Sequence, residues 1–247
     1  MQKHKNKFVG QDSDTIFDIQ RCLRMNDYTE IGDSSHYLVF DMLGMFSFRE
    51  LSVQQTIEFW LGFILELNIP LSHVTIHPDK QEWHKYYPST INVVELEDNK
   101  WSDGNIGGYC TEFFVDNIEI GNIVNPLGTC IDVGFGLQRL LNIKYNFITP
   151  SKLEVIQNAC ETLISSGVVP GSNKQQYILR KLLIDLLYIG GTIDHRFFDE
   201  VKSKQQDQYT KYIREKNKPK NKNKTPSFWL DTYGIDEHNI DKYKKIF

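Results

Sequence analysis

Hydrophobic and polar residues alternate in short runs through the first half of the chain, whereas residues from about 149 to 214 follow a helical period. The pattern changes near residues 146–150, where we place a domain boundary. Short runs rich in β-branched and aromatic residues predict strands before that boundary. These runs cover residues 37–40, 74–77, 90–96, 112–115, 118–124 and 129–133.

One long amphipathic helix is predicted among these strands, over about residues 52–68, with Pro70 just beyond its end. Most of the strands are joined by connections too short for a helical crossover, which favours antiparallel pairing. Residues 1–148 are therefore predicted to form an α+β domain, a mostly antiparallel sheet with helices flanking it. The apolar face of the helix comprises Ile57, Trp60, Leu61, Ile64 and Leu67.

Three helices are predicted after the boundary, over residues 152–165, 174–189 and 196–214, and they make residues 149–213 a helical domain. Ser151 with Glu154 three positions later indicates the start of the first helix. Residues 214–225 alternate Lys with Asn around Pro219 and predict a mobile basic linker, which could also follow RNA phosphates. The aromatic tail, residues 226–247, is expected to dock back on the body of the protein.

Composition narrows the class of protein. The chain has 247 residues, of which 40% are hydrophobic, enough for a core. Its net charge of -4 argues against a general nucleic-acid binder. The four cysteines form no C-x-x-C pair, and no apolar run is long enough to span a bilayer. We therefore expect a soluble, reduced, cytoplasmic protein with no membrane contact.

The sharpest local motif is IDVGFGLQRL, residues 131–140. A strand ending in Asp132 leads through Gly134 and Gly136 into a helix start that carries Arg139. Glycines allow a ligand to approach the backbone, a helix N-terminus favours an anion, and a carboxylate can hold an amine. The alternative is an ordinary strand-to-helix turn with a surface arginine.

A second candidate segment is the hairpin predicted over residues 20–48. Arg24 closes its first strand, and the second strand returns through His36 and Phe40. Such a hairpin can direct a guanidinium at a phosphate while an aromatic ring supports a base.

Together these two segments resemble motifs 2 and 3 of class II aminoacyl-tRNA synthetases. Their amino-acid sequences resemble those of alanyl-tRNA synthetases in particular. FDMLGMFSF resembles F-E-M-L-G-N-F-S-F, DNKW resembles D-N-F-W, and CTEFFVD resembles C-(S/T)-E-I-x-Y-D. IEIGNIV is similar to I-E-I-W-N-(L/I)-V, and DVGFGLQR to D-T-G-M-G-L-E-R. Residues 167–191 are similar to the segment that opens the helical tRNA-recognition domain, so the resemblance covers about residues 20–191.

This resemblance implies ATP-dependent formation of an aminoacyl adenylate, with Mg²⁺ as the accompanying ion. On the ATP side, Arg24 would clamp the α-phosphate and the carboxylate, and Arg139 would be the arginine of motif 3. Phe40 would lie under the adenine, with Gly136 in the motif 3 turn. His36 matches a motif 2 histidine that could contact ATP, although an ordinary strand histidine would look the same.

On the amino-acid side, the resemblance implies that Asp132 holds the substrate ammonium. Asn122 and Trp101 would line the pocket, and Gly134 would allow close backbone approach. The substrate would be alanine or another small amino acid.

The metal assignment is open. Glu112 and Glu119 are candidate Mg²⁺ ligands, but they could equally be surface carboxylates. His73, His77 and His84 are too widely spaced to predict a metal site.

The chain also departs from the family pattern. Motif 1 is largely missing before residue 20, and residues 25–27 replace a longer loop that carries a lysine. Gln138 replaces a glutamate, and Gly121 replaces a tryptophan, which we expect to enlarge the amino-acid pocket. Asp185 lies where the family has a pair of arginines, and predicts a tRNA-facing surface that repels phosphate.

Two functions therefore remain open. The first is an adenylate-forming ligase that passes a small amino acid to a tRNA 3′ end, a carrier protein or a small molecule. The second is a catalytically inactive synthetase-like module that binds RNA or a protein partner. The oligomeric state is not set by the sequence.

Overall fold

The chain folds into two compact units. The computed structural model describes residues 4–33, 35–147, 149–193 and 196–247. A sheet unit comprises Met1–Arg24 and Ser34–Thr149, and a helical unit comprises Met25–Asp33 and Pro150–Phe247. The short segment Met25–Asp33 thus belongs with helices that lie far from it in the sequence.

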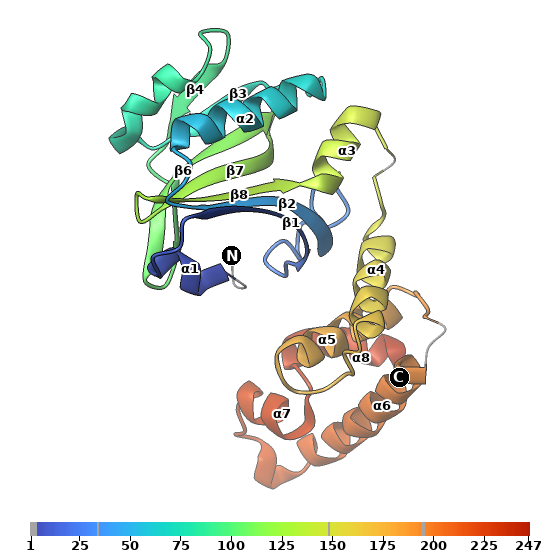
Figure 1. The fold of residues 1–247 in the computed structure, drawn as a ribbon. Coiled ribbons are helices and arrows are strands. Elements are labelled where there is room, and N and C mark those ends of the chain that lie inside the picture. Colours follow the sequence, from blue (N-terminus) through green and yellow to red (C-terminus); the bar gives the residue numbers. More distant parts are fainter. Residues whose placement is uncertain (1–3, 34, 148, 194–195) are drawn as a thin grey trace. The chain divides into compact units, whose positions relative to one another are not determined.

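Within the described part of the sheet unit, eight strands form one sheet (Figure 1). Their order is β1-β2-β8-β7-β6-β3-β4, and β5 pairs with β6 off this path. Every pairing is antiparallel except that of β3 with β4, so the predicted α+β class is confirmed. The strands are β1 (Asp14–Leu23), β2 (Val39–Phe48), β3 (His73–Ile76), β4 (Asn92–Glu95), β5 (Lys100–Asp103), β6 (Ile106–Val115), β7 (Ile118–Pro126) and β8 (Cys130–Gly136).

Two helices lie against opposite faces of this sheet (Figure 1). α2 (Val53–Glu66) begins at a capping box formed by Ser52 and Gln55, and its apolar side covers one face. α1 (Lys5–Val9) lies on the other face, where Phe8 is fully buried beside Phe46 and Phe48. The side chains between α2 and the sheet form the main core, which includes Met45, Ile57, Trp60, Ile64, Val74, Phe113, Ile123, Val133 and Phe135.

Strand β2 differs from the prediction. The predicted strand over residues 37–40 in fact begins at Val39 and continues to Phe48. All residues from Gly44 to Phe48 are buried, because α1 covers the face that the polar side of a strand usually presents to water. This double burial removes the alternation from which a strand is recognised.

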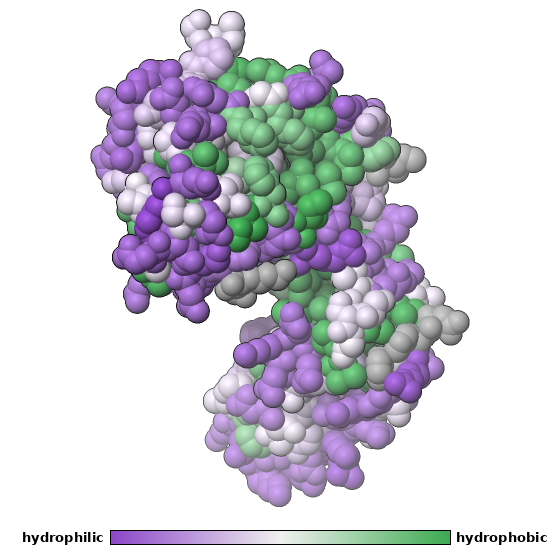
Figure 2. Space-filling view, viewed as in Figure 1, coloured by the Kyte–Doolittle hydropathy of each residue, from purple (hydrophilic) through white to green (hydrophobic). Residues whose placement is uncertain are grey.

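Further elements connect the strands of the sheet unit. A 3₁₀ segment, η2 (Pro78–Tyr86), joins the parallel strands β3 and β4. Helix α3 (Leu137–Tyr145) follows β8 directly and ends at Asn146, whose φ of 50° is left-handed. Figure 2 shows hydrophobic surface gathered over the sheet unit around α2, where Phe17, Ile19 and Phe59 are more than half exposed.

The helical unit contains mostly helices packed through apolar faces. The predicted capping box of Ser151 and Glu154 starts its first helix. The Lys/Asn run is structured in part, because α6 extends to Lys216 and a 3₁₀ turn follows. No helix in the described ranges is long and apolar enough to cross a membrane. The elements are α4 (Lys152–Ser165), α5 (Lys174–Tyr188), α6 (Arg196–Lys216), η3 (Pro219–Asn221), α7 (Pro226–Tyr233), η4 (Glu237–Asn239) and α8 (Ile240–Ile246).

Candidate active site

A row of directly paired residues crosses the sheet on the face opposite α2, here called the open face. Gly134 of β8 pairs with Gly44 on one side and with Asn122 on the other. Asn122 pairs with Glu112, and Glu112 pairs with Thr75 of β3. Because directly opposed residues of antiparallel strands point to the same face, this row places an amide and a carboxylate beside the glycine of the motif 3 turn.

Asp132 lies in the adjacent row of the same face. It pairs with Phe46 on β2 and with Val124 on β7. Trp101 packs against the cluster that contains Phe46, so apolar side chains flank the carboxyl. Burial raises the pKa of the Asp132 carboxyl to about 6. A carboxylate in this setting gains most from a cationic partner, and an ammonium group supplies one.

Glu112 and Glu119 form a pair of like charges on the open face. Burial, and then the charge of Glu119, raise the pKa of Glu112. Thr75 Oγ1 donates to Glu112 at 3.4 Å, and Asn122 Nδ2 donates to Glu119 Oε1 at 3.4 Å. A cation would relieve this repulsion, and Mg²⁺ commonly takes one or two carboxylates with phosphate oxygens completing its shell. Within the described residues, no His, Cys, Asp or Glu joins them to make a group of three.

Arg139 is held at the beginning of α3, three residues after Gly136, the residue that precedes this helix. Its Nε donates to the carbonyl of Ser35 at 2.8 Å, and Nη1 donates to the carbonyl of Glu119 at 2.7 Å. The carboxylate of Glu119 lies 4.0 Å from Nη1. These bonds fix the guanidinium beside the carboxylate pair and leave further N–H donors of the group for a ligand.

The motif 2 residues lie at the ends of β1 and β2. Arg24 directly follows β1, is exposed, and donates its backbone N–H to the carbonyl of Leu38 at 2.8 Å. Phe40 has the same alternation along β2 as Gly44 and therefore lies on the open face. His36 precedes β2 in a loop rather than in a strand, with Nδ1 3.1 Å from Ser35 Oγ.

The structure thus gathers most of the predicted residues on one face of the sheet. Arg24 and His36 lie outside the strands, and Arg139 joins the group through Glu119. Sequence reasoning missed Thr75 and Phe46, which could have been found only from strand register. The predicted site residues that lie on the open face include Phe40, Trp101, Glu112, Glu119, Asn122, Asp132 and Gly134.

Two further polar and apolar contacts shape this region. A Cβ at Gly134 would lie 3.0 Å from Met42 Sδ, so the room that this glycine leaves is partly taken by a side chain. Gln138, which replaces the family glutamate, accepts the backbone N–H of Asp41 through Oε1 at 2.8 Å. This residue therefore ties α3 to β2.

The expectation about Gly121 is wrong. Gly121 pairs with Phe135, and a Cβ added there would lie 2.3 Å from Phe135 Cδ1. Phe135 is fully buried beneath α2. A side chain at position 121 would thus enter the core, so its loss does not enlarge a pocket on the open face.

The expectation about Asp185 is also wrong. Asp185 is only 4% exposed, within the helical unit. It accepts hydrogen bonds from the hydroxyl of Tyr28 and from Lys242. Its charge is therefore not presented to a phosphate backbone as a surface aspartate would be.

Comparison with known proteins places the chain in a family. The sequence pattern of the family described as tRNA synthetases class II (A) matches residues 1–129. The alanine–tRNA ligase of Ehrlichia ruminantium (strain Welgevonden) is 27% identical over 261 positions, covering 74% of this chain and 29% of the relative. That of Francisella tularensis subsp. tularensis (strain WY96-3418) is 28% identical over 262 positions, covering 74% and 30%. The chain thus spans about 30% of the length of the curated relatives it matches. With a match over half of its length, the chain belongs to the class II (A) tRNA synthetase family.

Proposed function

We propose that the open face binds ATP and a small amino acid and forms an aminoacyl adenylate. The observation that carries this proposal is the pairing register of the strands. It puts Asp132, Asn122 and Glu112 on one face of the sheet, beside the motif 3 turn. A carboxylate for an ammonium, an amide for positioning and a carboxylate pair for a metal are the groups that this reaction needs.

In the proposed reaction, a carboxylate oxygen of the amino acid attacks the α-phosphorus of ATP. A new P–O bond forms to the amino acid, and the bond to the β-phosphate oxygen breaks, so that pyrophosphate leaves. The residues of the chain contribute charge neutralisation and alignment: Arg24 at the α-phosphate and Arg139 on the ATP side. When bound, Mg²⁺ would screen the phosphate charge, with Glu112 and Glu119 as its protein ligands.

The amino acid is proposed to be alanine or another small residue. Asp132 would hold its ammonium, and Asn122 would orient it. Trp101 and Phe46 belong to one apolar cluster next to Asp132, which favours a short side chain. The alanine–tRNA ligases among the relatives support this assignment.

The acceptor of the activated amino acid is proposed to be a tRNA 3′ end. A carrier protein or a small molecule would use the same adenylate and is the alternative. Helix α5 carries the Tyr-Ile-Leu-Arg sequence that resembles the opening of the helical tRNA-recognition domain, and this favours tRNA.

Amino-acid-dependent exchange of radiolabelled pyrophosphate into ATP tests the proposal. All twenty amino acids are assayed separately with Mg²⁺, and we expect exchange with alanine or another small amino acid. Arg24→Ala should remove most of it. Absence of exchange with all twenty, from a chain shown by circular dichroism to be folded, would refute the adenylation activity.

A catalytically inactive module is the second candidate. It is favoured by the bonds that Arg139 already makes to the carbonyls of Ser35 and Glu119, because an arginine engaged by its own chain can serve structure alone. Calorimetric titration with ATP and with RNA separates the two. Binding of RNA without binding of ATP would support the module.

A further inference from the structure

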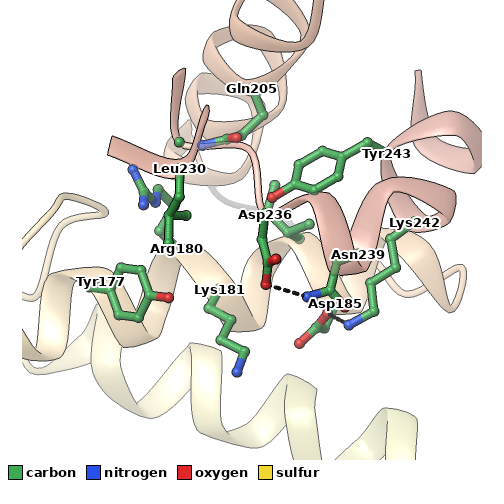
Figure 3. Close-up of a pocket in the computed structure, with 12 residues that line it drawn as sticks. Tyr177, Arg180, Lys181, Asp185, Gln205, Leu230, Asp236, Asn239, Lys242 and Tyr243 are labelled. Atoms are coloured by element: carbon green, nitrogen blue, oxygen red, sulfur yellow. Dashed lines mark hydrogen bonds and ion pairs between the residues drawn. The ribbon is translucent and has the colours of Figure 1, made fainter. Parts of the chain in front are cut away.

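A pocket lies within the helical unit, lined by residues of α5, α6, α7, η4 and α8 and of the turn that follows α7 (Figure 3). It has an empty volume of about 530 Å³, its open mouth included, which is the size of a site for a small metabolite. No residue of the open face lines it. The pocket is therefore a second candidate site, made by the helical unit alone.

Two buried amide oxygens on α6 lack a hydrogen-bond partner in this region. Gln205 is only 2% exposed and lines the pocket, and its Oε1 accepts from no donor among the described residues. Oε1 of Gln208 is likewise buried and without a donor within the described ranges. The two residues are three positions apart in α6, so their side chains lie on the same side of the helix. Because a buried acceptor without a donor is costly, each oxygen would gain from a ligand that donates a hydrogen bond.

Gly234 leaves space beside one of these oxygens. It ends α7 with a left-handed φ of 66° and lines the pocket. A Cβ at this position would lie 3.2 Å from Gln208 Oε1 and 3.6 Å from Arg180 Nη1. A ligand group in contact with Gly234 can therefore reach both polar atoms. A hydroxyl suits this place, because it can accept from a guanidinium and donate to an amide oxygen.

Arg180 brings a positive charge to the same place. The carbon of its guanidinium lies 5.5 Å from the centroid of the Tyr177 ring. No Asp or Glu in the described part of the chain forms an ion pair with it. A guanidinium offers five N–H donors in a planar fork, which matches the paired oxygens of a carboxylate or a phosphate. The pocket can therefore take an anionic group at Arg180.

The remaining charged groups of the pocket leave a positive excess. Lys242 Nζ pairs with Asp185 Oδ1 at 2.6 Å (Figure 3). Asp236, the second carboxylate, already accepts two hydrogen bonds from its own turn. Lys181 and Arg180 add two further positive charges, so three cationic side chains stand against two carboxylates. This excess favours an anion over a cation or a zwitterion.

We propose that this pocket binds a small organic anion that carries hydroxyl groups, such as a hydroxycarboxylate or the phosphate monoester of a polyol. The anionic group pairs with Arg180. The hydroxyl groups donate to Oε1 of Gln205 and to Oε1 of Gln208. This binding is independent of the adenylation proposed for the open face.

Calorimetric titration of the full chain with four probes tests the inference. sn-Glycerol 3-phosphate and D-glycerate each carry an anion together with hydroxyl groups, whereas acetate carries only the anion and glycerol only the hydroxyl groups. At least one of the first two should bind about tenfold more tightly than acetate or glycerol, because only these probes satisfy both the guanidinium and the amide oxygens. Their order shows whether the site takes a phosphate or a carboxylate.

Two pairs of variants locate the bound probe. Gln205→Leu removes the amide at similar size, and Gln206→Leu is its matched control, because Gln206 is the exposed next residue of α6. Arg180→Gln removes the cation, and Arg214→Gln is its control, because the Arg214 side chain is 70% exposed. The affinity for the probe should fall about tenfold in Gln205→Leu and about 10- to 100-fold in Arg180→Gln. Neither control should change it.

Thermal unfolding without ligand separates a binding role of Gln205 from a structural one. Because its buried oxygen has no partner in the described chain, Gln205→Leu should unfold at the same temperature as the wild type or higher. A lower unfolding temperature in Gln205→Leu, with unchanged affinity for the probe, would assign the residue to the fold alone and overturn the site.

Three further outcomes would also overturn the proposal. The first is that neither hydroxylated anion binds the wild type at millimolar concentration. The second is an equal affinity in all four variants, which would place the bound anion outside this pocket. The third is an RNA hairpin that binds more weakly to Gln205→Leu while the small anions do not bind, which would make the pocket part of an RNA-binding surface.

Discussion

Phe135 fills the space in which a side chain at Gly121 would lie. The two residues face each other across β7 and β8, and a Cβ at Gly121 would come within 2.3 Å of the Phe135 ring. The resembling motifs have tryptophan and methionine at these two positions. Relative to these motifs, β7 lacks the tryptophan side chain and β8 has phenylalanine in place of methionine. The ring of Phe135 stacks on Trp60 at 4.8 Å.

This relationship predicts coupled stabilities. Gly121→Ala should lower the free energy of unfolding by about 1–3 kcal/mol, because the methyl group has no room. In a Phe135→Leu background the same change should cost less, with a coupling of about 0.5–3 kcal/mol. Urea unfolding of the two single variants and the double variant measures the coupling. Strict additivity would mean that the two positions do not compete for space.

Asp132 is predicted to reduce stability at neutral pH. Its folded-state pKa, about 6, lies above the ordinary value of 3.8, so the folded state holds the proton more tightly than the unfolded state does. Stability should thus fall as pH rises from about 4 to about 6 and remain lower above that range. Asp132→Asn should then stabilise the ligand-free chain by roughly 1–3 kcal/mol at pH 7.5 and by almost nothing at pH 4. Thermal unfolding across this range provides the measurement, and an equal effect at both pH values would contradict the assignment.

The same substitution should have the opposite effect on the amino acid. Asn keeps the shape of Asp132 but not its charge, so the KM for the amino acid should rise far more than the KM for ATP. The expected loss is roughly 2–5 kcal/mol for a charge pair broken on one side. In the wild type, kcat/KM for the amino acid should fall below about pH 6, and the variant should lose this dependence. If kcat/KM of the variant still falls below about pH 6, a group other than Asp132 must cause that fall.

Arg24→Ala should reduce pyrophosphate exchange by roughly 30- to 1,000-fold, the usual effect of removing one charged contact to a reacting phosphoryl group. Arg21→Ala is a matched control, because Arg21 lies three residues earlier on β1 and pairs with Asp41, with Nε 2.9 Å from Oδ1. Asp41 is next to Phe40 on β2, so the side chains of the two residues point to opposite faces of the sheet. The Arg21–Asp41 pair therefore lies on the face opposite Phe40. Equal losses in both variants would show that the assay reports on β1 rather than on the phosphate contact.

The basic segment of residues 214–225 is predicted to bind RNA through only some of its lysines. Lys216 pairs with Glu237 and Lys218 with Glu215, whereas Lys220, Lys222 and Lys224 are exposed. Replacing these three with Gln should lower the slope of log affinity against log salt by about 2–3 for an acceptor-stem RNA hairpin. The Lys216→Gln, Lys218→Gln double variant should change the slope less. Equal slopes in all three proteins would exclude the segment from RNA binding.

Much of the sheet unit could be predicted, because its motifs are short and local. The turn from Asp132 through Gly134 to Arg139 is visible as a run of letters, and the structure places it at the junction of β8 and α3. The capping box of Ser151 and Glu154 is likewise a local signal.

The features that were missed depend on non-local register. Nothing adjacent to Gly121 in the sequence shows that it faces Phe135 and the core, and a bulge in the pairing of β6 with β7 alters the alternation just before it. Asp185 was misjudged for the same reason, since its partners Tyr28 and Lys242 lie 157 and 57 residues away. A lone carboxylate in a predicted helix is read as solvent-exposed until such distant partners are known.

The assignment of residues 25–33 to the helical unit constrains how this protein can be made and divided. A ribosome releases Tyr28 long before Asp185 exists, so the β1–β2 hairpin is completed around a loop whose packing partners are not yet synthesised. Late docking of this loop would be a step of high contact order at the end of folding. A gene split at residue 149 would keep the sheet unit whole but leave the helical unit incomplete, because Met25–Asp33 would remain with the sheet half.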